Sequence, residues 1–165
     1  MAHETRLELV KNEAPMWSPE LVALYRQQYA PLVRLAYGML GRRTEAEEVV
    51  QDAVLRLRDR WDQLDNPGAY LQRSVVNGCI SIIRRRGVAE RVPADPPPAD
   101  VPDRLVELRD VLLRLPERQR AAIVLRHVAG LDDVEIAEVL GLRRSTVRSL
   151  VARGLAAMQK EISNG

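Results

Sequence analysis

The sequence predicts an all-α fold made of two small helical domains joined by an extended acidic, proline-rich linker. Apolar residues recur at helical spacing in several segments, and residues that favour helix starts precede these segments. Aromatic residues make up only 4% of the chain and Phe is absent, which favours helical bundles over a sheet protein. A length of 165 residues is enough for one domain or two small ones.

Residues 1–17 are expected to form a weakly structured leader, and residues 18–88 an N-terminal helical domain. Three amphipathic segments in this domain each follow residues that favour a helix start. Pro31 lies inside the first segment and should kink or split that helix, because proline removes a backbone donor. The predicted starts are Ser18 with Pro19, Thr44 with Glu47 as a capping box, and Asn66 with Pro67, and Gly41 is expected to end the first helix.

The second expected helix has one apolar residue, Leu55, on its polar face. A single exposed leucine is common in proteins. Here, however, acidic and amide side chains surround it, and an apolar centre with a charged rim fits a protein interface. The residues of this candidate docking patch are Glu48, Gln51, Asp52 and Leu55.

The third expected helix is basic on one side. No acidic residue occurs between Asp65 and Glu90. A helix with an apolar side for packing and a cationic side suits a polyanionic partner, although a charged stripe alone also fits a solvated surface. The basic stripe consists of Arg73, Asn77, Ser81 and Arg84, followed by Arg85 and Arg86.

A segment of different composition, residues 89–103, separates the N-terminal helices from the C-terminal ones. Its sequence VPADPPPADVPD (92–103) contains five prolines and three aspartates and no basic residue. Such a segment is stiff and extended and builds no packed core. We therefore expect a linker between an N-terminal domain, residues 18–88, and a C-terminal domain, residues 104–165.

Residues 132–158 have the pattern of a helix-turn-helix. Asp132 and Glu135 predict a capping box, and Gly141 predicts the end of the first helix. The second helix combines an apolar stripe with a basic outer side, as insertion into a DNA major groove requires. An ordinary helical hairpin with a solvated basic face is the alternative. The apolar stripe is Val147, Leu150, Val151, Leu155 and Met158.

Several function classes find no support in the residues. Cys79 is the only cysteine, so an internal disulfide is excluded, and with His3 and His127 as the only histidines a Cys/His zinc site lacks ligands. Without a Gly-rich phosphate loop or a catalytic constellation, we expect no enzyme activity, no cofactor and no metal. No apolar run long enough for a membrane span or a signal peptide is present, which predicts a cytoplasmic protein.

Three segments resemble bacterial RNA polymerase sigma factors of the extracytoplasmic-function (ECF) group, which keep only conserved regions 2 and 4. TEAEEVVQDAVLRL (44–57) resembles region 2.2, and NPGAYLQRSVVNGCISIIRRR (66–86) resembles regions 2.3 and 2.4. LPERQRAAIVLRHVAGLDDVEIAEVLGLRRSTVRSLVARGL (115–155) resembles region 4. A helix-turn-helix alone is a weak signal, whereas three segments in this order and at these separations are a strong one.

For the N-terminal domain, the resemblance implies docking on the polymerase and opening of the −10 promoter element. In the family, the region 2.2 helix docks on the clamp helices, a coiled coil of the β′ subunit, a role that here falls to the docking patch. Regions 2.3 and 2.4 melt the −10 element and capture a flipped base. The residues that this implies for −10 DNA are Trp61, Asp62, Gln63, Asn66, Arg73, Asn77, Arg84, Arg85 and Arg86.

For the C-terminal domain, the resemblance implies recognition of the −35 element and contact with the β flap of core RNA polymerase. In the family, the linker threads into the active-site cleft and an anti-sigma factor commonly holds the protein inactive. Arg143 departs from the family, which often has Ser or Thr as the cap there, and Leu150 and Leu155 replace common arginines. The residues implied for −35 DNA are Arg144, Ser145, Arg148, Ser149 and Arg153.

The alternative function is a stand-alone helix-turn-helix transcriptional regulator with an N-terminal dimerisation or ligand domain. Such a protein would bind a palindromic duplex tightly without polymerase. The docking patch and the basic helix of residues 73–86 favour the sigma factor, because a stand-alone regulator needs neither.

Overall fold

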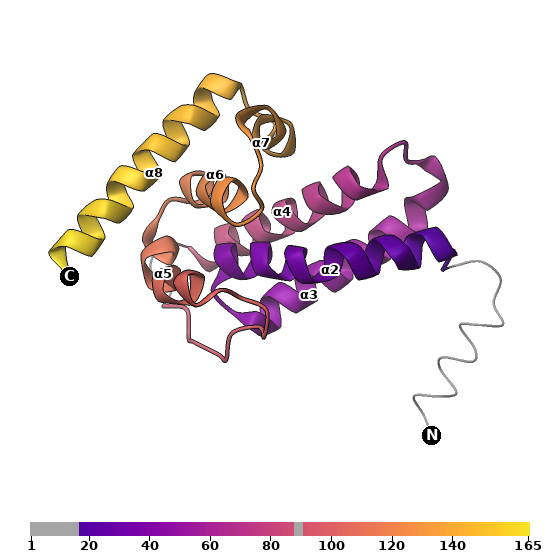
Figure 1. Ribbon diagram of the computed structural model, residues 1–165, viewed down its shortest axis with the longest axis horizontal. Helices are drawn as coiled ribbons and strands as arrows, with labels where there is room; N and C mark the ends of the chain where they lie inside the picture. The colour runs from indigo at the N-terminus through magenta and orange to yellow at the C-terminus, as the bar shows by residue number, and fades with distance from the viewer. Residues whose placement is uncertain (1–16, 88–90) are drawn as a thin grey trace.

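The computed structural model describes residues 17–87 and 91–165, and over these residues it consists of helices without strands, which confirms the predicted all-α fold. The predicted leader up to residue 16 and residues 88–90 lie outside the described residues. The N-terminal bundle comprises α2 (Pro19–Leu40), α3 (Arg43–Arg60), the short 3-10 turn η1 (Trp61–Gln63) and α4 (Pro67–Arg86) (Figure 1). The C-terminal bundle comprises α5 (Asp103–Arg114), α6 (Glu117–His127), α7 (Asp133–Leu140) and α8 (Arg144–Asn164).

Three of the four predicted helix starts carry the predicted caps. The side chains of Ser18 and Asn66 accept hydrogen bonds from backbone N–H groups in the first turns of α2 and α4. Asp132 and Glu135 form the predicted capping box of α7. Of the two predicted effects of Pro31, a kink or a split, the split is wrong, because helix α2 continues through this residue.

The start of α3 differs from the prediction. This helix follows Arg42, whose side chain makes no capping bond, and Thr44 lies inside the helix, so the predicted Thr44–Glu47 capping box is wrong. Instead, the carboxylate of Asp95 accepts hydrogen bonds from the backbone N–H groups of Arg43 (2.8 Å) and Thr44 (3.1 Å) and from the Thr44 hydroxyl (3.2 Å). A residue of the linker therefore satisfies the N-terminal donors of α3.

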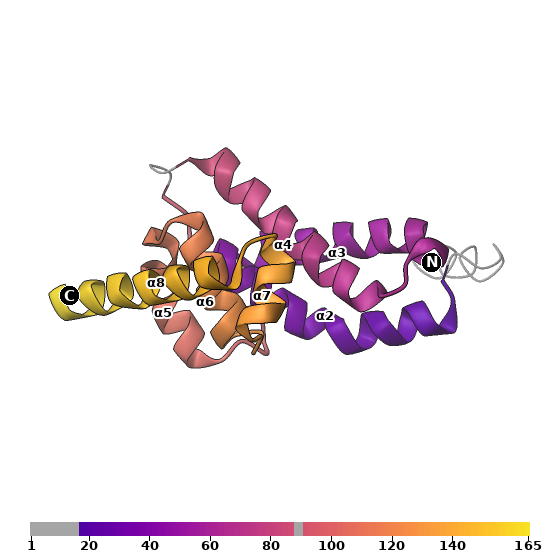
Figure 2. The ribbon, with the colours of Figure 1, turned by 90° about the horizontal axis from the view of Figure 1, so that it is seen from above.

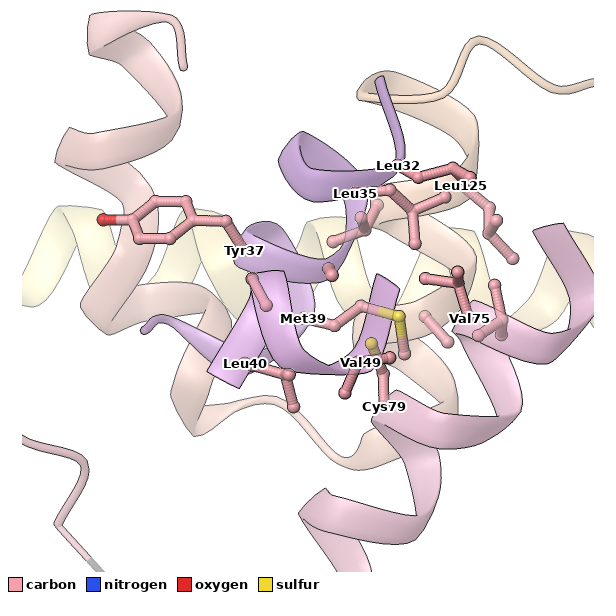
Figure 3. Packing of buried hydrophobic residues seen from close by; sticks show 14 of the residues in the cluster. Leu32, Leu35, Tyr37, Met39, Leu40, Val49, Val75, Cys79 and Leu125 are labelled. Atoms are coloured by element: carbon pink, nitrogen blue, oxygen red, sulfur yellow. The ribbon is translucent and has the colours of Figure 1, made fainter. Parts of the chain in front are cut away.

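The two bundles share one hydrophobic core. Helix α2 contacts α5 and α6, and α4 contacts α6 and α7 (Figures 1 and 2). Figure 3 shows Leu125 of α6 beside Leu32 and Leu35 of α2, and each of these side chains is at most 2% exposed. Val101 of the linker is also buried in this core, which departs from the prediction of a linker without packed residues.

Arginines from three other helices hold the C-terminal end of α2, whose own last turn has no basic residue. The last carbonyls of a helix lack intrahelical partners and carry a partial negative charge, so cationic donors stabilise them. Two of the three arginines belong to the C-terminal bundle. The donor–acceptor pairs are Arg120 with the Met39 carbonyl (2.8 Å), Arg86 with Leu40 (2.9 Å) and Arg109 with Gly41 (2.6 Å).

Candidate protein-binding and nucleic-acid surfaces

The docking patch lies on the outer face of α3. The helix packs into the bundle through its opposite face, which is buried at Ala46, Val49, Val50, Ala53, Val54 and Leu57. Glu48, Gln51 and Asp52 are exposed, and Leu55 is 43% exposed at the centre of this face. Among the described residues, none makes a side-chain hydrogen bond or ion pair with these four. The patch therefore combines an apolar centre with an acidic and amide rim that is open to a partner.

The basic stripe of α4 lies on the surface of that helix, but the C-terminal bundle contacts part of it. Arg73 donates a hydrogen bond to the backbone carbonyl of Glu138 (3.1 Å), which lies in α7. Arg84 pairs with Glu117 of α6 (2.8 Å), and this hydrogen bond raises the pKa of Arg84. Asn77 lines a small cavity together with residues of α6 and the α7–α8 turn. The two bundles thus meet at residues that the sequence assigns to DNA.

Arg86, which the sequence assigns to DNA, makes structural contacts in this conformation. Its side chain is only 12% exposed, because it donates to the Leu40 carbonyl and forms an ion pair with Glu45. An arginine held in this way is not available to a DNA backbone. Arg85, by contrast, is exposed at the end of α4.

The segment before α4 places its polar residues in solvent. The predicted loop starts as the 3-10 turn η1, in which Trp61 is half-buried and packs against the core. Asp62 and Gln63 of this turn are exposed. Asn66 is exposed as well, and its carboxamide oxygen caps α4. The indole of Trp61 is therefore partly exposed, next in sequence to these polar residues.

The helix-turn-helix of α7 and α8 turns at Gly141, whose φ of 65° is readily adopted by glycine. Helix α8 buries Val147, Val151 and Met158 against the rest of the C-terminal bundle. Its predicted apolar stripe is wrong at Leu155, which is 43% exposed. The residues assigned to the −35 element, Arg144, Ser145, Arg148, Ser149 and Arg153, are all exposed.

Gly154, the residue before Leu155, is buried instead of Leu155. A Cβ atom at residue 154 would collide with the side chain of Ile123, so the glycine allows α8 to approach α6 closely. The register of α8 against α6 thus depends on one residue without a side chain. The pattern of apolar side chains does not count glycine, so it does not predict that residue 154 is buried.

Asp133, the first residue of α7, connects the two helices of the motif. Its carboxylate accepts a hydrogen bond from Arg148 of α8 (3.0 Å) and forms an ion pair with Arg126 of α6. Arg148 therefore already has a partner before any DNA is bound, although its side chain remains 63% exposed. Sequence reasoning did not pair these residues, because their contact depends on the turn geometry.

The described residues contain no group of three His, Cys, Asp or Glu side chains that could hold a metal ion. Cys79 is completely buried in the core, and burial raises the pKa of its thiol to about 12. Within residues 17–87 and 91–165, no helix has the length and hydropathy that a membrane span requires.

Comparison with known proteins finds family models that match two segments of the chain. Residues 24–88 match the family model Sigma-70 region 2, and residues 105–158 match Sigma-70, region 4. The ECF RNA polymerase sigma factor SigE of Mycolicibacterium smegmatis is 36% identical over 85% of this chain and 59% of its own length. The RNA polymerase sigma-E factor of Streptomyces avermitilis is 30% identical over 84% of this chain and 83% of its own length.

A solved structure has a similar fold. The sigma factor RpoE of Bartonella quintana, in complex with the anti-sigma factor NepR, matches with a TM-score of 0.67 and 24% identity over 84% of this chain and 95% of that chain. The family models and the relatives agree with the helical architecture. This chain belongs to the ECF group of RNA polymerase sigma factors of the sigma-70 family. The N-terminal bundle corresponds to region 2 and the C-terminal bundle to region 4.

Proposed function

We propose that this protein binds core RNA polymerase through the docking patch of α3 and directs it to promoters with −10 and −35 elements. The observation that supports this function best is the outer face of α8. It presents three arginines and two serines in one exposed stripe, while the opposite face is fixed to the core. A rigidly held helix with a polar, cationic outer face has the geometry of a recognition helix in the major groove.

On this proposal, α8 reads the −35 element. Arginines at the exposed positions can donate two hydrogen bonds to a guanine edge, an interaction worth roughly 1–3 kcal/mol of discrimination. Arg148 would exchange its hydrogen bond with Asp133 for DNA or share it between the two. The first turn of α8 receives no side-chain cap from Arg143, and a helix start without such a cap suits a DNA phosphate at this end.

Region 2 would engage the −10 element through α4 and η1. Arg73, Asn77, Arg84 and Arg85 supply cationic and amide groups along one track, and Trp61 supplies a ring for stacking. The exposed Asp62, Gln63 and Asn66 would line the pocket for an extruded base. Arg86 is excluded from this set because it holds α2.

The protein itself would supply no catalytic chemistry, since the polymerase makes the RNA. Its proposed partners are the β′ clamp helices, the β flap, promoter DNA and, as for the relative whose structure contains NepR, an anti-sigma factor. This role places the protein in the cytoplasm, where the polymerase and the chromosome are.

Transcription from a reconstituted holoenzyme tests the proposal. Core polymerase with and without the purified chain is supplied with fragmented genomic DNA, and the 5′ ends of the transcripts are sequenced. We expect start sites that depend on the chain and share two conserved upstream elements. No chain-dependent transcripts, or tight binding to a palindromic duplex without core enzyme, would refute the proposal and favour a stand-alone regulator.

A further inference from the structure

One carboxylate joins three helices of region 4. Asp133 begins α7, which contacts both α6 and α8 (Figures 1 and 2). Its Oδ1 atom forms the ion pair with Nη2 of Arg126 in α6, and its Oδ2 atom accepts the hydrogen bond from Nε of Arg148 in α8 (3.0 Å). The side chain of Asp133 is only 21% exposed. One oxygen thus attaches the carboxylate to α6, and the other is a fixed acceptor beside the exposed face of α8.

The hydrogen bond to Asp133 leaves the end of the Arg148 guanidinium free. Nε is the donor, and within the part of the chain that the structure describes neither Nη1 nor Nη2 of Arg148 has an acceptor. The side chain is 63% exposed. Arginine recognises guanine by donating from two of its nitrogens to O6 and N7 of the base. The two Nη atoms can form this fork while Nε stays bonded to Asp133, so DNA binding need not break the existing bond.

The other two arginines in the exposed stripe of α8 differ from Arg148. Among the described residues, none accepts a hydrogen bond from the side chain of Arg144 or Arg153, although both are exposed. An arginine without a partner loses side-chain entropy when a ligand orders it. A phosphate contact tolerates a mobile charge, whereas the choice between base pairs requires donors in a fixed geometry. Arg148 is therefore the arginine of this stripe that is best suited to read a base.

We propose that Asp133 is a positioning residue for −35 recognition, which holds Arg148 by Nε and directs its two Nη atoms to a guanine, while Arg144 and Arg153 contact phosphates. This inference rests on the proposed −35 role of α8. Of the two possibilities for Arg148, exchange of its partner or sharing between Asp133 and DNA, it selects sharing. It assigns a part of the promoter specificity to a residue of α7 that itself need not touch DNA.

The test measures base preference at each position of the −35 element. Reconstituted holoenzyme transcribes a pool of barcoded templates in which the −35 element is randomised and the −10 element is one found by sequencing the transcript ends. The number of transcripts from each template gives the preference for each base pair. We expect the native chain to prefer a G·C pair in one orientation at one position, and Arg148→Ala to lower this preference roughly fivefold or more.

Asp133→Ala should lower the preference at the same position by about two- to tenfold, because DNA must then order the Arg148 side chain. Asp133→Asn keeps an oxygen acceptor but loses the charge, so its preference should lie between those of Asp133→Ala and the native chain. In the Arg148→Ala background, Asp133→Ala should have no further effect on base preference. A merely structural role of Asp133 would instead lower transcription from all −35 sequences alike and would persist in that background.

Glu161→Ala is the matched control. Glu161 of α8 accepts a hydrogen bond from Arg114 of α5 (2.7 Å), so this variant also removes a carboxylate that pairs with an arginine between two helices of region 4. Glu161 is not among the residues assigned to DNA, and its variant should keep the native preference at every position. Circular dichroism establishes that each variant remains helical. If Asp133→Ala loses helix content, Asp133→Asn decides the test.

Native base preference in the folded Asp133 variant would overturn the proposal. A loss of the same size in the Arg148→Ala background would also overturn it, and so would an Arg148→Ala variant that keeps every −35 preference. The native chain separates this inference from the proposed function. If it directs transcription but the Asp133 variants behave in one of these ways, only the positioning role is refuted, whereas a native chain without any chain-dependent transcripts refutes the proposed function.

Discussion

Region 2 has two surfaces whose side chains differ in their bonding partners, although the sequence predicts both as exposed faces of amphipathic helices. No side chain of the docking patch of α3 bonds to another described residue, whereas Arg73 and Arg84 in the basic stripe of α4 bond to residues of α7 and α6. Both helices belong to the same bundle, so the difference comes from the C-terminal bundle. The comparison teaches that helical periodicity identifies an exposed face but does not show which of its side chains already have partners within the protein.

The largest expected effect concerns the docking patch of α3. Leu55→Asp places a charge at the centre of the docking patch, where a buried apolar anchor in an interface is worth about 2 kcal/mol or more. We expect its affinity for a purified β′ clamp-helix fragment to fall roughly 30-fold. Leu155→Asp is the matched control, because Leu155 is equally 43% exposed but lies on α8. Equal losses for both variants would contradict a specific role of the α3 face.

A second test distinguishes the recognition of DNA bases by α8 from the electrostatic attraction of DNA to α4. Arg148→Ala should weaken discrimination at the −35 element by roughly 1–3 kcal/mol, so that transcription falls on some templates and little on others. Arg85→Ala should weaken binding on all templates alike and lower the slope of log affinity against log salt by about 1. Competition between promoter variants measures both. The same loss on every template for Arg148→Ala would rule out base reading at that residue.

The smallest effect concerns the contact of Asp95 with the first turn of α3. Burial alone would raise the pKa of this carboxyl, but hydrogen bonds from Arg43 and Thr44 and the nearby charge of Arg42 outweigh it and hold the pKa below 3.8. Stability from a lowered carboxyl pKa is present above the unfolded value and lost as the pH falls through the folded value. Tyr37 does not contribute to this response, because a phenol is neutral at acidic pH and burial raises its pKa still further.

We therefore expect the free energy of unfolding of the native chain, measured by denaturant unfolding, to fall by about 1 kcal/mol, as for other N-caps, as the pH falls through the lowered pKa of Asp95. Asp95→Ala should lack this contribution and lose less stability over this range. The same pH response in both chains would show that other carboxyl groups control the loss of stability.

Sequence reasoning succeeded where the cause of a structure is local. The exposed faces of α3 and α8 follow from helical periodicity, and the caps at Ser18, Asn66 and Asp132 involve neighbours within one turn. The fold class and the family segments follow from the same short-range patterns.

Prediction failed where a residue acts across a long stretch of chain. Asp95, 51 residues after Thr44, caps the start of α3. The capping-box pattern compares residues only three apart, so it predicted a box of Thr44 and Glu47 instead. Arg120 reads as a surface arginine, yet it is buried because distant carbonyls at the end of α2 accept its donors. The periodic pattern counts only apolar side chains, so it assigned Leu155 to the core and overlooked Gly154, which is the residue that packs there.

The most direct test of the account measures one pair of proteins against two ligands. The affinities of the native chain and of Leu55→Asp are determined for the β′ clamp-helix fragment and for a labelled single-stranded DNA. The account predicts that Leu55→Asp binds the clamp helices roughly 30-fold more weakly and binds the single-stranded DNA with the same affinity as the native chain. A variant that changes both affinities by the same factor, or neither, would contradict the claim that α3 and α4 carry separate binding surfaces.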